Sequence, residues 1–188
     1  IAVTAGPGSY TGLRVGLATA KGLCYATQKP LILINTLEVM ALASNQLQDT
    51  GYQLQNTNTQ TGNQKPETEN CLFCPMIDAR RMEVYASVFD SSLNEVKSTE
   101  AVIIDSRSYE GILSRGKMLF FGDGAAKCME ALGHNANALF DMEFQCSAKY
   151  IVSLSEAAFR EKNFEDTAYF EPFYLKDFIA GVSKKRII

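Results

Sequence analysis

The sequence predicts an α/β protein. Short apolar runs typical of buried strands alternate with segments of helical periodicity, and a glycine-rich turn joins the first run to the first helical segment. The 188 residues suffice for one domain or two small ones, and a hydrophobic content of 46% is ample for a core.

The first part of the chain is expected to form strand, helix, strand and helix. The apolar run IAVT at residues 1–4 precedes the glycine-rich turn, and a helix is expected from residue 9 or 10 to residue 26. PLILIN at 30–35 is an uninterrupted apolar run typical of a buried strand. The hydroxyl of Thr36 is expected to cap a second helix over 37–47.

Residues 46–70 interrupt this pattern. Gln, Asn and Thr make up most of the segment, which offers almost nothing to bury. We predict a flexible polar connection. It is either a linker between domains or a long surface insertion within one domain.

Strands come first again after this connection. Apolar and aromatic runs on both sides of DARR predict a hairpin over 71–90, and a third strand is expected at 96–104. The elements expected next are a short helix at 108–114, a strand at 117–122, a helix at 125–133, a strand at 138–144, and a helix at 148–162 capped by Ser147.

Three antiparallel strands followed by alternating helices and strands form the unit of the ribonuclease H-like fold. Two such units in tandem give the architecture shared by actin, sugar kinases and Hsp70 chaperones. Residues 1–45 match only the C-terminal half of one unit, so we expect a hairpin and a third strand before Ile1. Residues 46–70 would then be the connection, and residues 71–188 the second unit with a C-terminal tail.

The glycine-rich turn lies within TAGPGSYTGLR, residues 4–14. Its loop residues of interest are Gly6, Gly8, Ser9 and Thr11. A Walker A loop needs a Lys after its last glycine, where Leu13 stands. The spacing of Gly6, Gly8 and Gly12 nearly matches the dinucleotide fingerprint, but Asn35 occupies the end of the next strand, where a ribose-binding carboxylate would lie. A small-molecule kinase or NADP-type enzyme that uses this turn is therefore the alternative function.

Small residues recur every four positions along the first helix. Glycine in a helix costs about 1 kcal/mol relative to alanine, so two glycines on one stripe indicate that another backbone approaches closely. The approaching element is either the helix's own sheet or a partner helix. The candidate partner-interface residues are Gly12, Leu13, Gly16, Leu17, Ala20 and Cys24.

Three residues near the strand ends are weaker candidates for binding a nucleotide or phosphate. Asp78 and Arg80 lie at the hairpin tip, and Asp123 lies in the turn FGDGAAK. We favour structural roles for the two carboxylates, with Asp78 accepting from turn amides and Asp123 capping a helix.

Composition argues against several other classes. A net charge of −3 gives no basic field for direct nucleic-acid binding, and no apolar stretch approaches the ~20 residues of a membrane helix. Five scattered cysteines suit a reducing compartment, so we expect a cytoplasmic protein. The single histidine, His134, is expected in a loop and cannot supply a pair of histidine ligands. The odd spacing of Cys71 and Cys74 would put them on opposite faces of a strand, where they could not bind one metal ion together, so we predict no metal site.

Several motifs together resemble the TsaB family, also called YeaZ. They are AGPGSYTGLRVG with AKGL, IDARRMEVYA, GDGAAK and FEPFYLKD, in order over nearly the whole chain. TsaB is the non-catalytic paralogue in the bacterial machinery that makes threonylcarbamoyladenosine beside the tRNA anticodon. The family was formerly labelled a glycoprotease, but this sequence shows no set of nucleophile, base and orienting group that a protease would need.

The resemblance implies a non-catalytic role within an enzyme complex. The chain would pair with a TsaD-type catalytic subunit through helices of the first unit, and homodimerise through the same surface. A TsaE-type ATPase would join the complex, and contact with tRNA would be indirect. ATP and metal would lie in the partner subunits, so the resemblance implies no cofactor for this chain.

Overall fold

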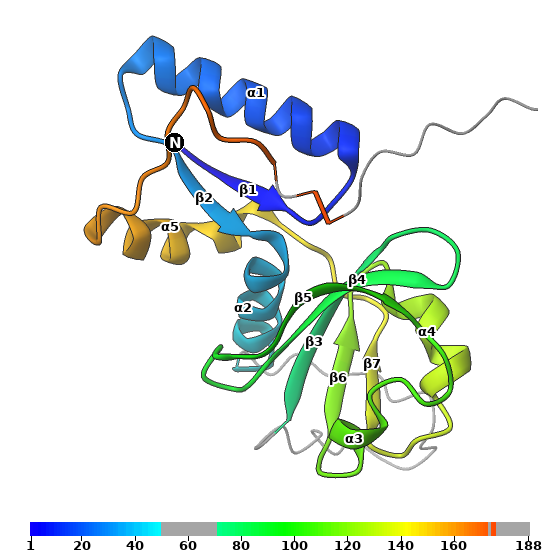
Figure 1. The fold of residues 1–188 in the computed structure, drawn as a ribbon. Helices are drawn as coiled ribbons and strands as arrows, with labels where there is room; N and C mark the ends of the chain where they lie inside the picture. The colour runs from blue at the N-terminus through cyan, green and yellow to red at the C-terminus, as the bar shows by residue number, and fades with distance from the viewer. Residues whose placement is uncertain (50–70, 173, 176–188) are drawn as a thin grey trace, which may run out of the picture.

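Two β-sheets organise the protein (Figure 1). The structure, a computed structural model, describes residues 1–49, 71–172 and 174–175. Most of the predicted connection at 46–70 therefore lies outside the described residues. Within the described part, no helix is long and apolar enough to cross a membrane.

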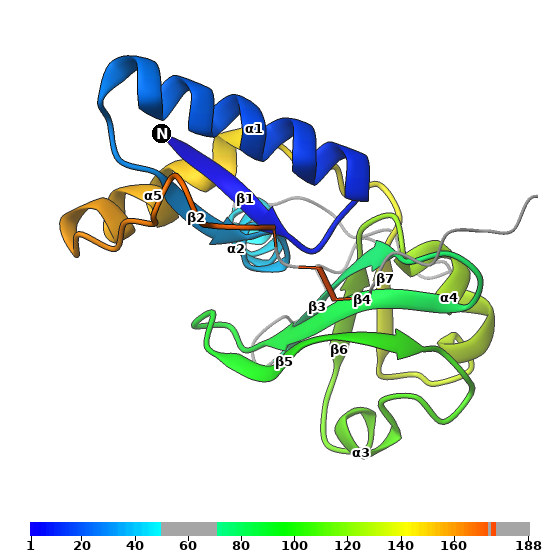
Figure 2. The same cartoon turned by 45° about the horizontal axis from the view of Figure 1, so that its top comes forward.

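The smaller sheet comprises the parallel strands β1 (Ala2–Gly6) and β2 (Ile32–Asn35). Helix α1 (Tyr10–Thr27) covers one face of this sheet, and α5 (Ile151–Arg160) covers the other (Figures 1 and 2). Among the described residues, β1 pairs with another strand along one edge only.

The larger sheet has five strands in the order β5-β4-β3-β6-β7. Their bounds are β3 (Leu72–Asp78), β4 (Glu83–Phe89), β5 (Glu95–Ile103), β6 (Met118–Phe121) and β7 (Ala138–Asp141). The pairs β3–β4 and β4–β5 are antiparallel, whereas β3–β6 and β6–β7 are parallel. The sequence predicted these five strands along the chain, with the first three antiparallel, and the α/β class is confirmed.

Helices cover both faces of the larger sheet. Helix α4 (Ala125–Leu132) packs on one face, while α2 (Thr36–Asp49) packs on the other through Leu37 and Met40. The short α3 (Glu110–Leu113) follows β5, and a 3-10 turn at Ala148–Tyr150 leads into α5. Cys74 and Cys71 lie in the separate cores on the two faces, as their odd spacing predicted.

The packing groups differ from the sequence divisions. Val39 and Ala43 turn the other side of α2 toward α5 and β2, so α2 lies between the two sheets. Helix α5 follows the larger sheet in sequence but packs on the smaller one. The division at 1–45, 46–70 and 71–188 stays a prediction; in the described residues, α2 extends past residue 45 and α5 packs on the first sheet.

The start of α2 corrects one local prediction. The Leu37 amide donates to Asn35 Oδ1 at 2.8 Å, so Asn35 caps the helix. Thr36 lies within the helix, and its buried hydroxyl oxygen has no hydrogen-bond partner among the described residues. The cap predicted at Thr36 was therefore wrong. Asn35 also donates through Nδ2 to Thr99 Oγ1 at 3.0 Å, which ties α2 to β5.

Candidate functional site

The glycine-rich turn aims α1 across the smaller sheet. Gly6 has a φ of 118°, a left-handed value that an L side chain rarely adopts. Ser9 caps the helix, because its Oγ accepts from the Gly12 amide at 3.4 Å and its carbonyl accepts from the Leu13 amide at 2.8 Å. Thr11 is exposed in the first turn of α1.

The small-residue stripe of α1 faces the protein's own sheet. Leu17, Ala20 and Cys24 form a buried cluster with Leu31. A Cβ added to Gly16 would lie 3.8 Å from Val3 Cγ2, an ordinary contact. Of the two explanations left open by the sequence, close packing on the helix's own sheet is the one that the structure supports for these residues.

The remaining predicted interface residues lie nearer the turn. Gly12 is exposed, whereas Leu13 is half-buried with Gly8 beside it. The buried part of the predicted interface, Leu17, Ala20 and Cys24, cannot meet a partner in this conformation. The close approach of another backbone predicted for the helix glycines is not seen at Gly12 or Gly16, where an added Cβ would make only ordinary contacts with side chains. The sequence also did not reveal on which side of the helix the sheet lies.

An exposed face runs along the opposite side of α1. Its residues, here called the outer face, are Thr11, Arg14, Val15, Ala18, Thr19, Gly22, Tyr25 and Ala26. Val15 is 62% exposed and Tyr25 is 81% exposed. Arg14 is the charged residue of this face, whereas Val15, Ala18, Tyr25 and Ala26 give it apolar surface. The sequence analysis missed this face, although apolar residues on both sides of one helix are a visible signal for it.

A cavity of about 390 Å³ opens between the glycine-rich turn and the larger sheet. Its walls are formed by Val3, Thr4, Pro7, Gly8, Ser9, Gly12, Leu13, Gly16, Thr36, Met40, Ile77, Gly122, Asp123, Phe144 and Cys146. None of these described lining residues is Lys, Arg or His, so a phosphate group would meet no cationic side chain in the wall. Both helix glycines of the stripe, Gly12 and Gly16, therefore border an open space, and Gly16 also lies against Val3 of the sheet.

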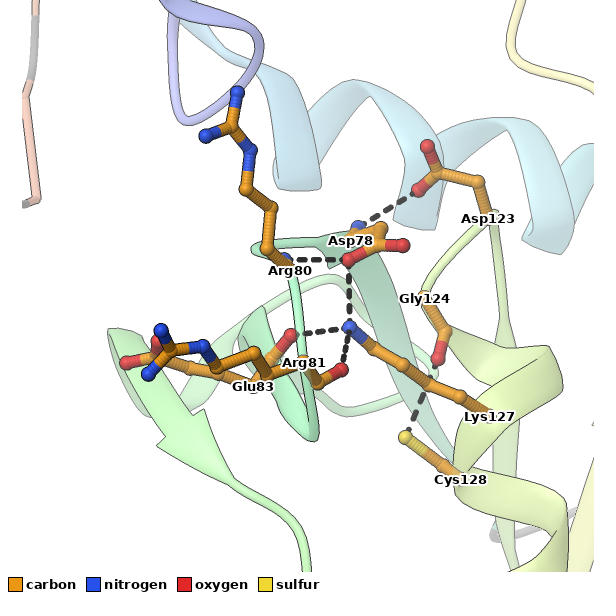
Figure 3. Close-up of polar contacts among 8 residues, drawn as sticks. All are labelled: Asp78, Arg80, Arg81, Glu83, Asp123, Gly124, Lys127 and Cys128. Carbon is orange, nitrogen blue, oxygen red and sulfur yellow. Dashed lines mark hydrogen bonds and ion pairs between the residues drawn. The ribbon is translucent and has the colours of Figure 1, made fainter. Parts of the chain in front are cut away.

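The hairpin tip between β3 and β4 is held by a polar network (Figure 3). The Lys127 ammonium donates to Asp78 Oδ1 at 2.6 Å, and it also donates to the carbonyls of Arg81 at 2.8 Å and Glu83 at 2.6 Å. Asp78 Oδ1 accepts from the Arg80 amide at 2.6 Å. The hydrogen bond from Lys127, followed by that from the Arg80 amide, lowers the pKa of the Asp78 carboxyl.

This network decides the roles of the weaker candidates. Asp78 accepts from a turn amide, as we favoured. Asp123 accepts from the Asp78 amide at 3.0 Å. The residue at the N-cap of α4 is Gly124, with no side-chain hydrogen bond, so the helix cap predicted at Asp123 was wrong. The Arg80 side chain points away from the carboxylates (Figure 3). The sequence analysis assigned no role to Lys127, because its partners are distant in sequence.

The thiols and the histidine show no shared site. Burial raises the pKa of Cys71 and of Cys128 to about 11, and it raises the pKa of Cys74 as well. His134 lies exposed in a turn, as predicted. Among the described residues, no three His, Cys, Asp or Glu side chains gather in a metal-binding arrangement.

The sheet order and the helix on each face define an α/β protein of the ribonuclease H-like type. A family model described as TsaD, tRNA N6-adenosine threonylcarbamoyltransferase, matches residues 1–183. The chain therefore belongs to this family.

Curated relatives and solved structures give two further comparisons. The tRNA N6-adenosine threonylcarbamoyltransferases of Methylobacterium nodulans and Anaplasma phagocytophilum are 48% and 51% identical over 52 and 49 residues, which are 28% and 26% of this chain. These segments span only 15% and 14% of the relatives' own lengths.

Among solved structures, YeaZ from Pseudomonas aeruginosa matches with a TM-score of 0.64 at 19% identity, over 93% of this chain and 74% of that one. A second Pseudomonas aeruginosa protein, described as similar to the peptidase YEAZ, matches with a TM-score of 0.66 at 19% identity, over 93% and 73% of the two chains. The resemblance to TsaB, or YeaZ, is thereby confirmed for the fold.

Proposed function

We propose that this chain is a non-catalytic subunit of the machinery that makes threonylcarbamoyladenosine in tRNA, and that it binds a TsaD-type catalytic subunit through α1. Family membership supports the pathway. The observation that carries the binding role is the outer face of α1, where Val15 and Tyr25 are exposed on a helix without acidic residues. Interfaces favour such apolar and aromatic side chains over charged ones.

The division of labour is part of the same proposal. The catalytic subunit supplies ATP and metal, a TsaE-type ATPase joins the complex, and the chain meets tRNA only through its partners. A homodimer through the outer face is the alternative state when the catalytic subunit is absent. We propose a cytoplasmic location, because all five cysteines, each within the described residues, are free thiols.

Gly22 offers a sharp test of the binding surface. It lies on the outer face, and a Cβ added there would meet nothing within 4 Å in the chain itself. Gly22→Leu should therefore raise the stability of the free chain by the better part of 1 kcal/mol, because leucine favours a helix more than glycine does. If α1 packs on a partner helix, the added side chain should weaken association about tenfold or more.

Gly111→Leu is the matched control, since Gly111 is also an exposed helix glycine with nothing within 4 Å. Calorimetric titration against the TsaD-type subunit from the same organism measures both variants. Unchanged affinity for Gly22→Leu, alongside unchanged affinity for the control, would remove α1 from the interface.

The cavity beside the glycine-rich turn supports a second candidate, the binding of a nucleotide by a kinase or NADP-type enzyme. Its volume of about 390 Å³ suits a small molecule, but the described wall holds no basic side chain. A ligand at 100 times its dissociation constant adds about 2.7 kcal/mol to stability. No thermal shift with millimolar ATP or NADP would exclude this candidate. A shift that Gly16→Leu abolishes would support it, because that side chain would enter the cavity.

A further inference from the structure

The segment after α5 returns along α1. We call residues 164–172 the strap; in Figure 1 it is the orange to red segment beside the helix. Its start is fixed where the Glu165 amide donates to the Leu31 carbonyl at 2.9 Å, just beyond the end of α1. Phe170 packs on the buried cluster of α1, and past the strap the Tyr174 ring lies 5.1 Å from the Tyr10 ring. The segment therefore runs antiparallel to the helix along its whole length.

Lys21 anchors the middle of the strap. Its ammonium donates to the Phe170 carbonyl at 2.6 Å and to the Ala168 carbonyl at 3.4 Å. These two carbonyls belong to the residues on either side of Tyr169. Hydrogen bonds from an ammonium are stronger than those between neutral groups, so Lys21 fixes the backbone on both sides of this tyrosine.

A turn fixes the same residue from the other direction. Asp166 Oδ1 accepts from the Ala168 amide at 2.7 Å and from the Tyr169 amide at 3.3 Å. Despite these restraints on its backbone, Tyr169 is 85% exposed. A large aromatic side chain on a restrained backbone loses little conformational freedom on binding, and this combination is typical of protein-binding surfaces.

The strap is continuous with the outer face of α1. Lys21 and Tyr25 lie one helical turn apart, so they are neighbours on the helix surface. Tyr25 is 81% exposed, like Tyr169 on the adjacent strap. Lys21 therefore joins the part of the strap that carries Tyr169 to the turn of α1 that precedes Tyr25.

We propose that the strap and the outer face of α1 form one composite surface for a second protein, with Tyr169 as its contact residue and Lys21 as the positioning residue. The inference rests on the proposed function, because the protein bound is the catalytic subunit. Charge favours a different protein over a second copy. The outer face carries Arg14 and no acid, so a second copy of the chain would offer Arg14 no opposite charge, whereas a partner helix with acidic side chains would complement it.

Two variants test the surface by titration against the catalytic subunit of the same organism. Tyr169→Ala should weaken binding about tenfold or more while leaving the melting temperature unchanged. Ile103→Ala is the control, because Ile103 is 73% exposed on β5, away from α1, and it should bind as wild type does. If Tyr169→Ala bound the catalytic subunit as tightly as the wild type while Gly22→Leu bound it more weakly, the binding role of the strap would be refuted. The proposed function would still stand. No binding by the wild-type chain would overturn both.

Lys21 needs a readout beyond affinity. In Lys21→Met, we expect the Ala168 and Tyr169 amides to exchange hydrogen faster and the affinity to fall as it does for Tyr169→Ala. Lys21→Arg, which retains the donors, should restore both. Unchanged exchange in Lys21→Met would overturn the positioning role. Self-association that Tyr169→Ala abolishes, without any effect on the catalytic subunit, would overturn the choice of partner.

Discussion

Replacing Lys127 with methionine should loosen the hairpin tip. Its side chain is only 19% exposed, and its ammonium serves three acceptors that belong to β4, to the turn and to Asp78. The ion pair between Lys127 and Asp78 alone contributes little to the free energy of unfolding, because the Asp78 carboxylate is 49% exposed and solvent screens it. The two backbone carbonyls lose a charged donor as well, so we expect a loss of about 2 kcal/mol in the free energy of unfolding. That corresponds to a fall in melting temperature of about 4–8 °C.

The control is Arg160→Met, because Arg160 pairs with Glu156 at 3.5 Å while their side chains are 79% and 62% exposed. The free energy of unfolding of that variant should differ from that of the wild type by no more than about 0.5 kcal/mol. Equal melting of the two variants would refute the role given to Lys127. Part of the difference should also depend on pH. The pKa of Asp78 is lowered in the folded protein. The ionised Asp78 carboxylate therefore stabilises the folded protein above its ordinary pKa of 3.8, and this stabilisation is lost as the pH falls through the lowered pKa of the folded state.

Three residues with positive φ give further predictions. Arg80 and Arg81 have φ values of 71° and 53°, which Asn and Gly adopt more readily than Arg. Replacing Arg80 with Asn and Arg81 with Gly should therefore raise the free energy of unfolding, measured by chemical denaturation, by about 1–2 kcal/mol. No gain would show that the arginine side chains hold the turn. Gly122 has a φ of 97°, and a Cβ there would strike the Met76 carbonyl oxygen. Gly122→Ala should therefore cost about 3 kcal/mol or more, whereas Gly116→Ala, with nothing within 4 Å, should melt like wild type.

The order of strands and helices could be predicted because it depends on local patterns. The apolar runs around 71–90 formed the expected hairpin. The Ser147 hydroxyl accepts from the Lys149 amide at 3.5 Å, so Ser147 caps the 3-10 turn that leads into α5 rather than α5 itself. The alternation of apolar and glycine-rich segments likewise predicted a helix, α1, between β1 and β2 in the order along the chain. Such signals lie within a few residues of the elements that they define.

What could not be predicted depends on distant contacts. Helix α1 is apolar on two sides, so its sequence alone did not reveal that Leu17 and Cys24 face the sheet while Tyr25 faces outward. Helix α5 packs on the smaller sheet although the larger one precedes it, and no local pattern carries that information. Lys127 reaches Asp78 across 49 residues of sequence for the same reason.

The formation of threonylcarbamoyladenosine in a purified system tests the proposed function most directly. The assay would compare the catalytic subunit alone, this chain alone, and both together, with the TsaE-type ATPase, ATP, an activated threonylcarbamoyl donor and unmodified tRNA present throughout. We predict that the modified nucleoside accumulates only when both are present, and that Gly22→Leu lowers its yield while Gly111→Leu does not. Modification by this chain alone, or an equal yield without it, would contradict a non-catalytic partner-binding role.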